Sequence, residues 1–219
     1  MSDTTSLAEH RSKELLAGHG VPFLPERAVT SATDAAAAAA ELGLPVAIKL
    51  TGEHIAHKTE RGLVRLGVAT TDDAHRVATE LLGLVRPDDG EVALLVAPMA
   101  RFTREFIIGS FIDPTFGPIV LFGVGGVLAE AIDDAVARLV PLTLADALEM
   151  LDDLRTATIL DAFRGEPPVD REALARVVLA VAEAMAAHPE LESIDLNPVA
   201  IVDGRPVALD ALCVVRMAP

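Results

Sequence analysis

Two short segments in the first half of the chain carry basic side chains whose types and spacing could support chemistry. Lys49 lies at the end of the apolar run 45–50. A lysine at the end of a buried strand is expected either to face a bound ligand or to extend its ammonium group to solvent. His57 lies in the polar stretch 51–62, where a largely unprotonated imidazole could act as a nucleophile. His54 lies three residues earlier, but no third ligand is near in sequence, so a metal site is the weaker interpretation.

A glycine cluster at Gly123, Gly125 and Gly126 follows an apolar run in the middle of the chain. Glycines let backbone N–H groups approach an anion closely. The spacing does not match the dinucleotide-binding fingerprint, and no Lys-Ser/Thr pair follows as in a P-loop. An anion-binding turn and a simple tight connection after a strand are therefore both compatible with this cluster.

Oxygen ligands gather near the C-terminus. Asp195 and Asn197 share one face of a predicted strand, because side chains alternate along a strand with a period of two. Asp210 follows the Asp-Gly turn at 203–204 and is expected on the partner strand, where it could converge with Asn197. Two such oxygens together with nucleotide phosphates are typical of Mg²⁺ binding. The alternative interpretation is a capped turn with solvated acids.

Hydrophobic periodicity predicts helices and strands that alternate in the first half of the chain and hairpins in the second. Helices are expected at 7–16, 34–40, 72–86, 144–154 and 171–187, and strands at 45–50, 63–69, 92–96, 105–111, 119–122, 194–201 and 207–215. Pro98 is expected to stop one of these strands. The Ala-rich run 34–40 could be a linker, but alanine strongly favours helix. The fold class is mixed α+β, with an N-terminal helix in 1–20 and two lobes at 21–97 and 98–219.

The composition excludes several classes of protein. The 219 residues include 18 Lys and Arg against 33 Asp and Glu, a net charge of −15, so a binder of the nucleic-acid backbone is not expected. A single cysteine excludes an internal disulfide framework and favours a reducing compartment. Apolar stretches end well before the roughly 20 residues that a membrane helix needs. We therefore expect a soluble cytoplasmic protein.

Several uncommon strings occur in one order along nearly the whole chain, from about Leu7 to Val215. They are Ala47-Ile48-Lys49-Leu50, His57-Lys58-Thr59-Glu60, Asp113-Pro114-Thr115-Phe116-Gly117-Pro118, Phe122-Gly123-Val124-Gly125-Gly126, Ile194-Asp195-Leu196-Asn197-Pro198 and Leu209-Asp210-Ala211. In this order they resemble the ATP-grasp subunit of ADP-forming acyl-CoA synthetases, relatives of succinyl-CoA synthetase.

The resemblance implies an ATP-grasp fold with two lobes that enclose ATP or ADP. His57 would exchange a phosphoryl group with a phosphohistidine on a separate CoA-binding subunit and pass it to ADP. Lys49 would contact the nucleotide phosphates, and Asn197 and Asp210 would bind Mg²⁺. The protein would then be one half of a hetero-oligomeric acid–thiol ligase.

The same resemblance assigns nucleotide contacts to the backbone of two further segments. Residues 95–99, including Val96, Ala97 and Met99, fall where the family's hinge meets adenine. The amides around Gly125 and Gly126 could hold the transferring phosphoryl group.

The chain departs from the family pattern at three places. Thr59-Glu60 replaces Ser-Asp, Leu63 replaces a glycine, and Leu212 replaces an arginine. Leu63 and Leu212 keep a second function open, a nucleotide-binding regulatory module without turnover. A third alternative is a carboxylate–amine ligase with the same fold, in which His57 has no role. Cys213 is expected to be inert packing, Arg104, Arg138 and His188 to be surface or pairing residues, and Glu105 and Glu130 to support the site from a distance.

Overall fold

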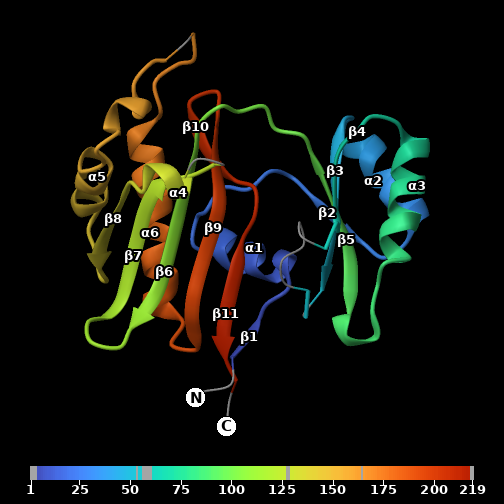
Figure 1. The fold of residues 1–219 in the computed structure, drawn as a ribbon, viewed down its shortest axis with the longest axis horizontal. Helices are drawn as coiled ribbons and strands as arrows, with labels where there is room; N and C mark the ends of the chain where they lie inside the picture. The colour runs from blue at the N-terminus through green and yellow to red at the C-terminus, as the bar shows by residue number, and fades with distance from the viewer. Residues whose placement is uncertain (1–3, 53, 56–60, 127–128, 164, 218–219) are drawn as a thin grey trace. The chain divides into compact units, whose positions relative to one another are not determined.

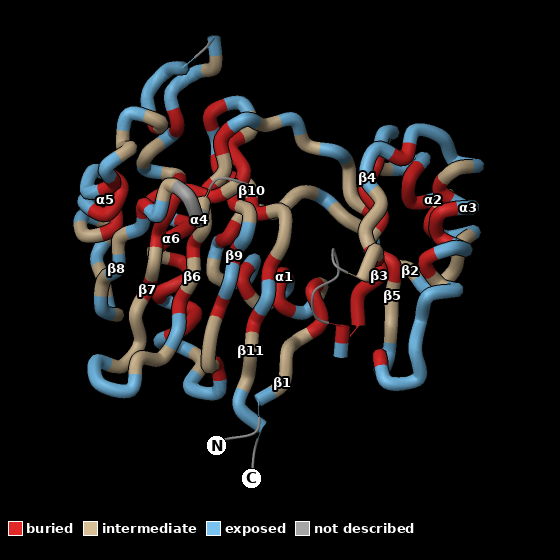
Figure 2. Tube along the Cα trace, in the orientation of Figure 1, coloured by how far each residue is buried: buried red, intermediate tan, exposed pale blue. Residues whose placement is uncertain are grey.

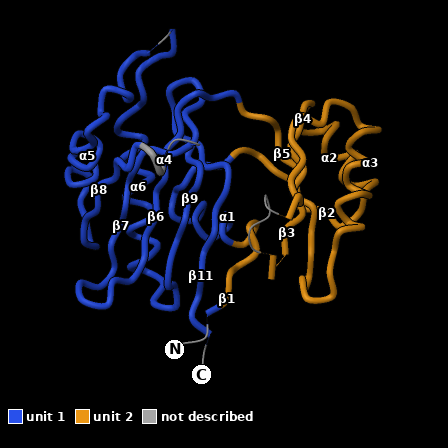
Figure 3. Tube along the Cα trace, viewed as in Figure 1, with its two compact units in different colours: residues 1–4, 12–23, 101–219 blue, residues 5–11, 24–100 orange. Residues whose placement is uncertain are grey.

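The computed structural model describes residues 4–52, 54–55, 61–126, 129–163 and 165–217. The chain forms two compact units (Figure 3). Unit 1 comprises Met1–Thr4, Ser12–Phe23 and Arg101–Pro219, and unit 2 comprises Thr5–Arg11 and Leu24–Ala100. The helix α1 (Glu9–Gly18) therefore contributes residues to both units. In the described part of the chain, no helix is long and apolar enough to cross a membrane.

Unit 2 is built on a four-stranded antiparallel sheet with the order β2-β5-β3-β4 (Figure 1). Its strands are β2 (Arg27–Val29), β3 (Val46–Gly52), β4 (Val64–Val68) and β5 (Val92–Pro98). Six of the seven residues of β3 are buried, and Lys49 is the half-buried exception. This pattern confirms the prediction of a strand buried on both faces.

Two helices, α2 (Ala32–Leu42) and α3 (Thr71–Leu82), pack on each other and on this sheet. The Ser31 hydroxyl caps α2 by accepting from the Asp34 amide at 3.1 Å, and Gly43 ends the helix at a φ of 89°. Ala35, Ala38 and Ala39 form its buried face, so the Ala-rich run is a core helix and the linker interpretation is wrong. Helix α3 ends at Leu82 rather than at the predicted residue 86 because Gly83 follows.

Strand β5 ends at Pro98 as predicted, although it runs two residues beyond the predicted end at residue 96. Pro98 is the last residue of β5 and lies opposite Val46 of β3. Since β5 ends here, the missing N–H of proline interrupts no further ladder.

Unit 1 contains a sheet with the order β1-β11-β9-β6-β7-β8, in which β10 also pairs with β9 (Figure 1). The strands are β1 (Thr4–Ser6), β6 (Glu105–Asp113), β7 (Gly117–Val124), β8 (Ala135–Leu139), β9 (Leu191–Val202), β10 (Arg205–Ala208) and β11 (Leu212–Arg216). The helices are α4 (Ala129–Ile132), α5 (Leu144–Asp152) and α6 (Arg171–Ala187), with a 3-10 helix at Ala157–Leu160.

Helix α6 covers one face of this sheet. It packs on β6, β7 and β9, and Figure 2 shows buried residues along the helix and these strands. Phe106 and Phe122 stack here with ring centroids 5.3 Å apart, and both are fully buried. The other face of each strand carries the alternate residues, which include Asp195 and Asn197 of β9.

The predicted C-terminal hairpin forms, but its second strand is interrupted. Asp203 and Gly204 make the turn with φ values of 50° and 81°, as expected for an Asp-Gly hairpin. The predicted strand 207–215 is divided into β10 and β11, which both pair with β9. The break lies opposite the part of β9 that holds Pro198, which has no N–H to donate to a ladder.

Candidate functional site

Lys49 points its ammonium group at a buried carboxylate. Its Nζ lies 2.8 Å from Glu9 Oε1, and the side chain of Glu9 is 1% exposed. The Glu9 amide donates to Thr51 Oγ1 at 3.2 Å, which ties this glutamate to the strand that carries the lysine. The ammonium group is therefore held in place by an ion pair within unit 2 rather than extended to solvent. Glu9 is a partner that the sequence pattern did not identify.

His57 lies outside the described residues, as do its neighbours in 56–60. The described residues on either side are well anchored. Ile55 is 7% exposed, and its amide donates to Gly52 O at 3.2 Å. Leu63, at the position where the family pattern has a glycine, is 1% exposed, and its carbonyl accepts from the Leu50 amide at 2.9 Å. Leu63 therefore fills the core of unit 2.

The predicted adenine contacts lie on β5 and just after it. Val96 is fully buried and pairs with β2 on one side and β3 on the other, so its side chain belongs to the core. Strand β2 begins at Arg27, opposite Val96, so Ala97 has no partner on that side among the described strands. Met99 is 37% exposed, and its amide donates to Pro45 O at 3.0 Å. The backbone of Ala97 is therefore better placed for a ligand than the backbone of Val96.

Gly125 and Gly126 form a turn that packs tightly against Glu105. The Gly125 amide donates to Glu105 O at 2.8 Å, and a Cβ at Gly125 would lie 3.0 Å from the Phe106 carbonyl carbon. Gly126 has a φ of 88°, and a Cβ there would lie 2.4 Å from Glu105 Oε1. Both positions thus need glycine, and a half-buried carboxylate lies directly beside the turn.

Asn197 and Asp210, the oxygen-bearing residues predicted near the C-terminus, lie on neighbouring segments of the sheet. The register between β9 and its neighbours is the same on both sides of the break, with Ala208 opposite Val199 and Leu212 opposite Asp195. Asp210 therefore falls opposite Asn197, in the connection between β10 and β11 rather than on the predicted partner strand.

Asp195 adds a second carboxylate to this group. It is exposed at the sheet surface, yet the surrounding protein raises the pKa of its carboxyl, and the negative charge of Asp210 raises it further. This coupling means that the two carboxylates lie close enough to repel each other. Two carboxylates and the amide oxygen of Asn197 are the donors that Mg²⁺ prefers, and a bound cation would relieve the repulsion. The residues present therefore fit a magnesium ion.

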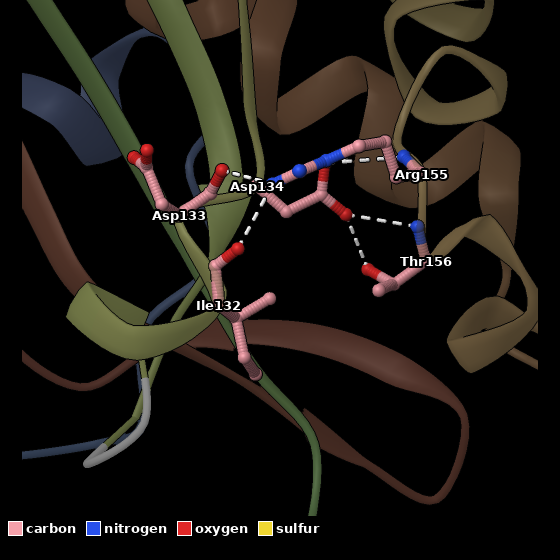
Figure 4. A network of polar contacts seen from close by, with 5 residues as sticks. All are labelled: Ile132, Asp133, Asp134, Arg155 and Thr156. Carbon is pink, nitrogen blue, oxygen red and sulfur yellow. Dashed lines mark hydrogen bonds and ion pairs between the residues drawn. The ribbon is translucent and has the colours of Figure 1, made fainter.

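Asp134, a buried aspartate directly before β8, contacts Arg155 and Thr156 (Figure 4) and, through its backbone, the strand that leads into the glycine turn. Asp134 O accepts from the Val124 amide at 3.0 Å, directly before Gly125. Its carboxylate accepts from the Thr156 amide at 2.8 Å, the Thr156 hydroxyl at 2.5 Å and the Arg155 amide at 3.1 Å. Burial by itself would raise the pKa of Asp134, but these hydrogen bonds outweigh burial, so the pKa is lowered.

Arg155 completes this network. Its guanidinium donates to Ile132 O at 2.9 Å and to Asp133 O (Figure 4). The sequence pattern did not show that Asp134 is buried. The signal that could have indicated this burial is the pair Asp133-Asp134, which lies between the glycine turn and the short strand β8.

The residues expected to have structural roles do so. Arg104 is 2% exposed and donates to the Glu166 carboxylate and to the carbonyls of residues 159, 161 and 167, so it is a buried pairing residue. Cys213 is fully buried, and burial raises the pKa of its thiol to about 11, which makes the thiol unreactive.

Comparison with known proteins identifies the family of the chain. The ATP-grasp domain family model matches residues 1–215. The beta subunit of ADP-forming acetate–CoA ligase I from Pyrococcus furiosus is 32% identical over 213 residues, which cover 96% of this chain and 92% of that subunit. A trans-feruloyl-CoA synthase from an unknown prokaryotic organism is 37% identical over 95% of this chain, but the match spans only 30% of that longer protein.

A solved structure shows the same fold. It is acetyl-coenzyme A synthetase 1 of Ca. Korarchaeum cryptofilum in complex with coenzyme A and Mg-AMPPCP, with its phosphohistidine segment pointing towards the nucleotide binding site. The TM-score is 0.82 at 30% identity, over 96% of this chain and 93% of that chain. The protein therefore belongs to the ATP-grasp family, in the group that includes the beta subunits of ADP-forming acetate–CoA ligases.

Proposed function

We propose that the protein is the nucleotide-binding subunit of an ADP-forming acyl-CoA synthetase, and that it transfers a phosphoryl group reversibly between ATP or ADP and His57. The observation that carries this proposal is the strand register that places Asp210 opposite Asn197, with Asp195 beside them. In a chain whose family relatives are ADP-forming ligases, such a group of oxygens is best explained as the ligand set for nucleotide-bound magnesium.

Each charged group on the nucleotide has a counterpart in the chain. Asn197 and Asp210 would hold Mg²⁺, which neutralises phosphate charge when it is bound. Lys49, already positioned by Glu9, would contact phosphate oxygens. The N–H of Gly126 would help to hold the transferring group, while the N–H of Gly125 already donates to Glu105 O at 2.8 Å and shapes the turn. Ala97 would contact adenine through its backbone.

His57 would act as the nucleophile. The neutral imidazole attacks the terminal phosphorus of ATP in line, the bond to the leaving oxygen of ADP breaks, and ADP departs. The phosphohistidine would then pass its phosphoryl group to a CoA-binding subunit, which we propose to be a separate chain and the site of acyl and CoA recognition.

A labelling experiment tests this mechanism. The complex of this chain with its CoA-binding partner is incubated with magnesium and ATP labelled on the terminal phosphate. We expect a base-stable, acid-labile adduct on this chain that is lost in His57→Ala and retained in the control His54→Ala. Full acyl-CoA formation by His57→Ala would contradict the mechanism and favour a carboxylate–amine ligase. Adenine nucleotide binding without any adduct would favour a regulatory module.

The metal ligands are tested separately. Asp210→Asn should lower the rate of adduct formation by about 10² to 10³. Part of this loss should be recovered at high Mg²⁺ concentration, since the variant keeps one ligand oxygen. An unchanged rate at low Mg²⁺ would exclude Asp210 as a ligand.

A further inference from the structure

One residue contacts both described ends of the segment that carries His57. The carbonyl of Asp89 accepts from the His54 amide at 3.4 Å, directly before this segment. The carboxylate of Asp89 accepts from Arg61 Nη1 at 2.7 Å and Nη2 at 2.9 Å, directly after it. A paired contact of this kind fixes both the position and the plane of the guanidinium group.

Asp89 is itself firmly held. It lies in the 3-10 helix Pro87–Asp89 and is 3% exposed. Its carboxylate accepts from the Arg86 amide at 2.8 Å, and its own amide donates to Arg86 O at 3.1 Å. The guanidinium of Arg61 holds the pKa of Asp89 at about 2, well below its ordinary value. The carboxylate is therefore ionised throughout the neutral range, and the ion pair with Arg61 is permanent there.

The strand that leads into the segment packs against the same residue. A Cβ at Gly52, the last residue of β3, would lie 3.0 Å from Asp89 O, so the backbone of β3 approaches Asp89 as closely as glycine allows. Ile55 and Leu63 are buried in the core on either side of the segment. The two ends are thus bound to one another through Asp89 and to the core of unit 2.

We propose that Asp89, through Arg61, is a positioning residue for phosphoryl transfer: it fixes where the segment carrying His57 begins and ends. The inference rests on the proposed role of His57. Holding both ends reduces the conformational freedom of the chain between them, so a smaller entropy loss is needed to place the imidazole in line with a phosphate. Asp89 contributes to the rate in this way without contacting the nucleotide.

The test compares Asp89→Asn with the control Asp88→Asn in the complete complex. Asp88 is the exposed neighbour on the same turn, so its substitution removes the same charge without touching Arg61. Asp89→Asn should slow adduct formation on His57 in a single turnover by about tenfold to hundredfold. Its Kd for Mg-ADP should stay within about twofold of the unsubstituted protein. Asp88→Asn should change neither quantity.

Arg61→Lys provides a second route should Asp89→Asn fail to fold. It keeps the charge but loses the paired geometry, and it should produce a partial loss of rate with the same unchanged affinity. Hydrogen exchange adds a readout independent of the chemistry: the amides of residues 61–63 should exchange faster in Asp89→Asn than in Asp88→Asn.

Two outcomes separate this inference from the proposed function. If the unsubstituted complex forms no adduct, the proposed function fails. If the adduct forms at an unchanged rate in Asp89→Asn and Arg61→Lys, or if their Kd for Mg-ADP weakens as much as their rate, the positioning role is wrong while the function stands.

Discussion

Asp89 in unit 2 and Asp134 in unit 1 are both buried carboxylates next to segments of the proposed site, but different donors hold them. Asp89 is held mainly by the guanidinium of Arg61, a residue 28 positions earlier in the chain. Asp134 is held by two backbone amides and a hydroxyl from residues 155 and 156, with only a 3.4 Å contact to the guanidinium Nε. One carboxylate thus depends on an ion pair, and the other on neutral donors.

The difference suggests two modes of support. The glycine turn beside Asp134 is a rigid backbone feature, and a fixed array of neutral donors holds it without a counter-charge. The Asp89 contact links two chain ends around a segment that must present its histidine to two partners in the proposed reaction. An ion pair between side chains ties the described end of that segment at Arg61 to Asp89.

The largest loss of stability is expected from removing the neutral hydrogen-bond donors' partner, the carboxylate of Asp134. Asp134→Ala leaves the amides of Arg155 and Thr156 without a partner in a buried place and should lower the free energy of unfolding by about 3–5 kcal/mol. Urea denaturation measures this quantity. The control Asp133→Asn, which keeps a residue tolerant of the φ of 46° at that position, should change it by less than about 0.5 kcal/mol. Equal losses of unfolding free energy in the two variants would show that the hydrogen bonds of Asp134 do not stabilise this part of unit 1.

A smaller loss of stability is expected from filling the glycine turn next to Asp134. Gly126→Ala forces an alanine into a φ of 88° and displaces the Glu105 carboxylate, which together should cost about 2–3 kcal/mol. Gly117→Ala is the matched control, since Gly117 has a φ of 81° with nothing near its Cβ position, and should cost about 1–2 kcal/mol. Thermal unfolding of both variants gives the difference. If the two variants are equally stable, Glu105 does not constrain the turn.

Acid should weaken the ion pair between Asp89 and Arg61 over a defined pH range. The pKa of Asp89 is lowered from 3.8 to about 2 in the folded protein, so its stabilising contribution is complete above pH 4 and is lost as the pH falls through 2. That contribution is about 2 kcal/mol. Unfolding free energies measured between pH 5 and pH 2 should fall less steeply for Asp89→Asn than for the unsubstituted protein. Parallel curves would contradict the Asp89–Arg61 ion pair.

The smallest loss of stability is expected from removing an exposed ion pair. Arg76 on α3 contacts Asp73 and Glu80 at 3.1 and 2.7 Å, but its side chain is 59% exposed. Arg76→Ala should therefore change the free energy of unfolding by less than about 0.5 kcal/mol. A loss as large as that in Asp134→Ala would mean that burial does not determine which of these charges matter.

Much of the fold could be predicted from local sequence. Helix α6 has the predicted bounds 171–187, because an apolar face repeats along it and Asp170 caps it. The strands β2 and β8 were not predicted. Strand β2 has three residues, and β8 alternates only between half-buried and exposed positions, so neither carries a strong apolar signal. Their place in a sheet depends on the strands beside them.

The candidate site could likewise be predicted only in part. The sequence of a single strand predicts that Asp195 and Asn197 lie on the same face of β9. The Asp-Gly pair at 203–204 predicts the turn that follows the strand. The position of Asp210 opposite Asn197 required the register across an interruption that the pattern did not predict.

The sequence by itself determined the family, because short motifs occur in one order along the chain, and the residue types available for phosphoryl transfer. It also determined the main helices and strands, because these depend on patterns within a few residues. Only the tertiary structure decided that Lys49 meets Glu9, that Arg61 meets Asp89 and that Thr156 meets Asp134. These partners lie 40, 28 and 22 residues apart, so their contacts arise from packing of whole elements rather than from local periodicity.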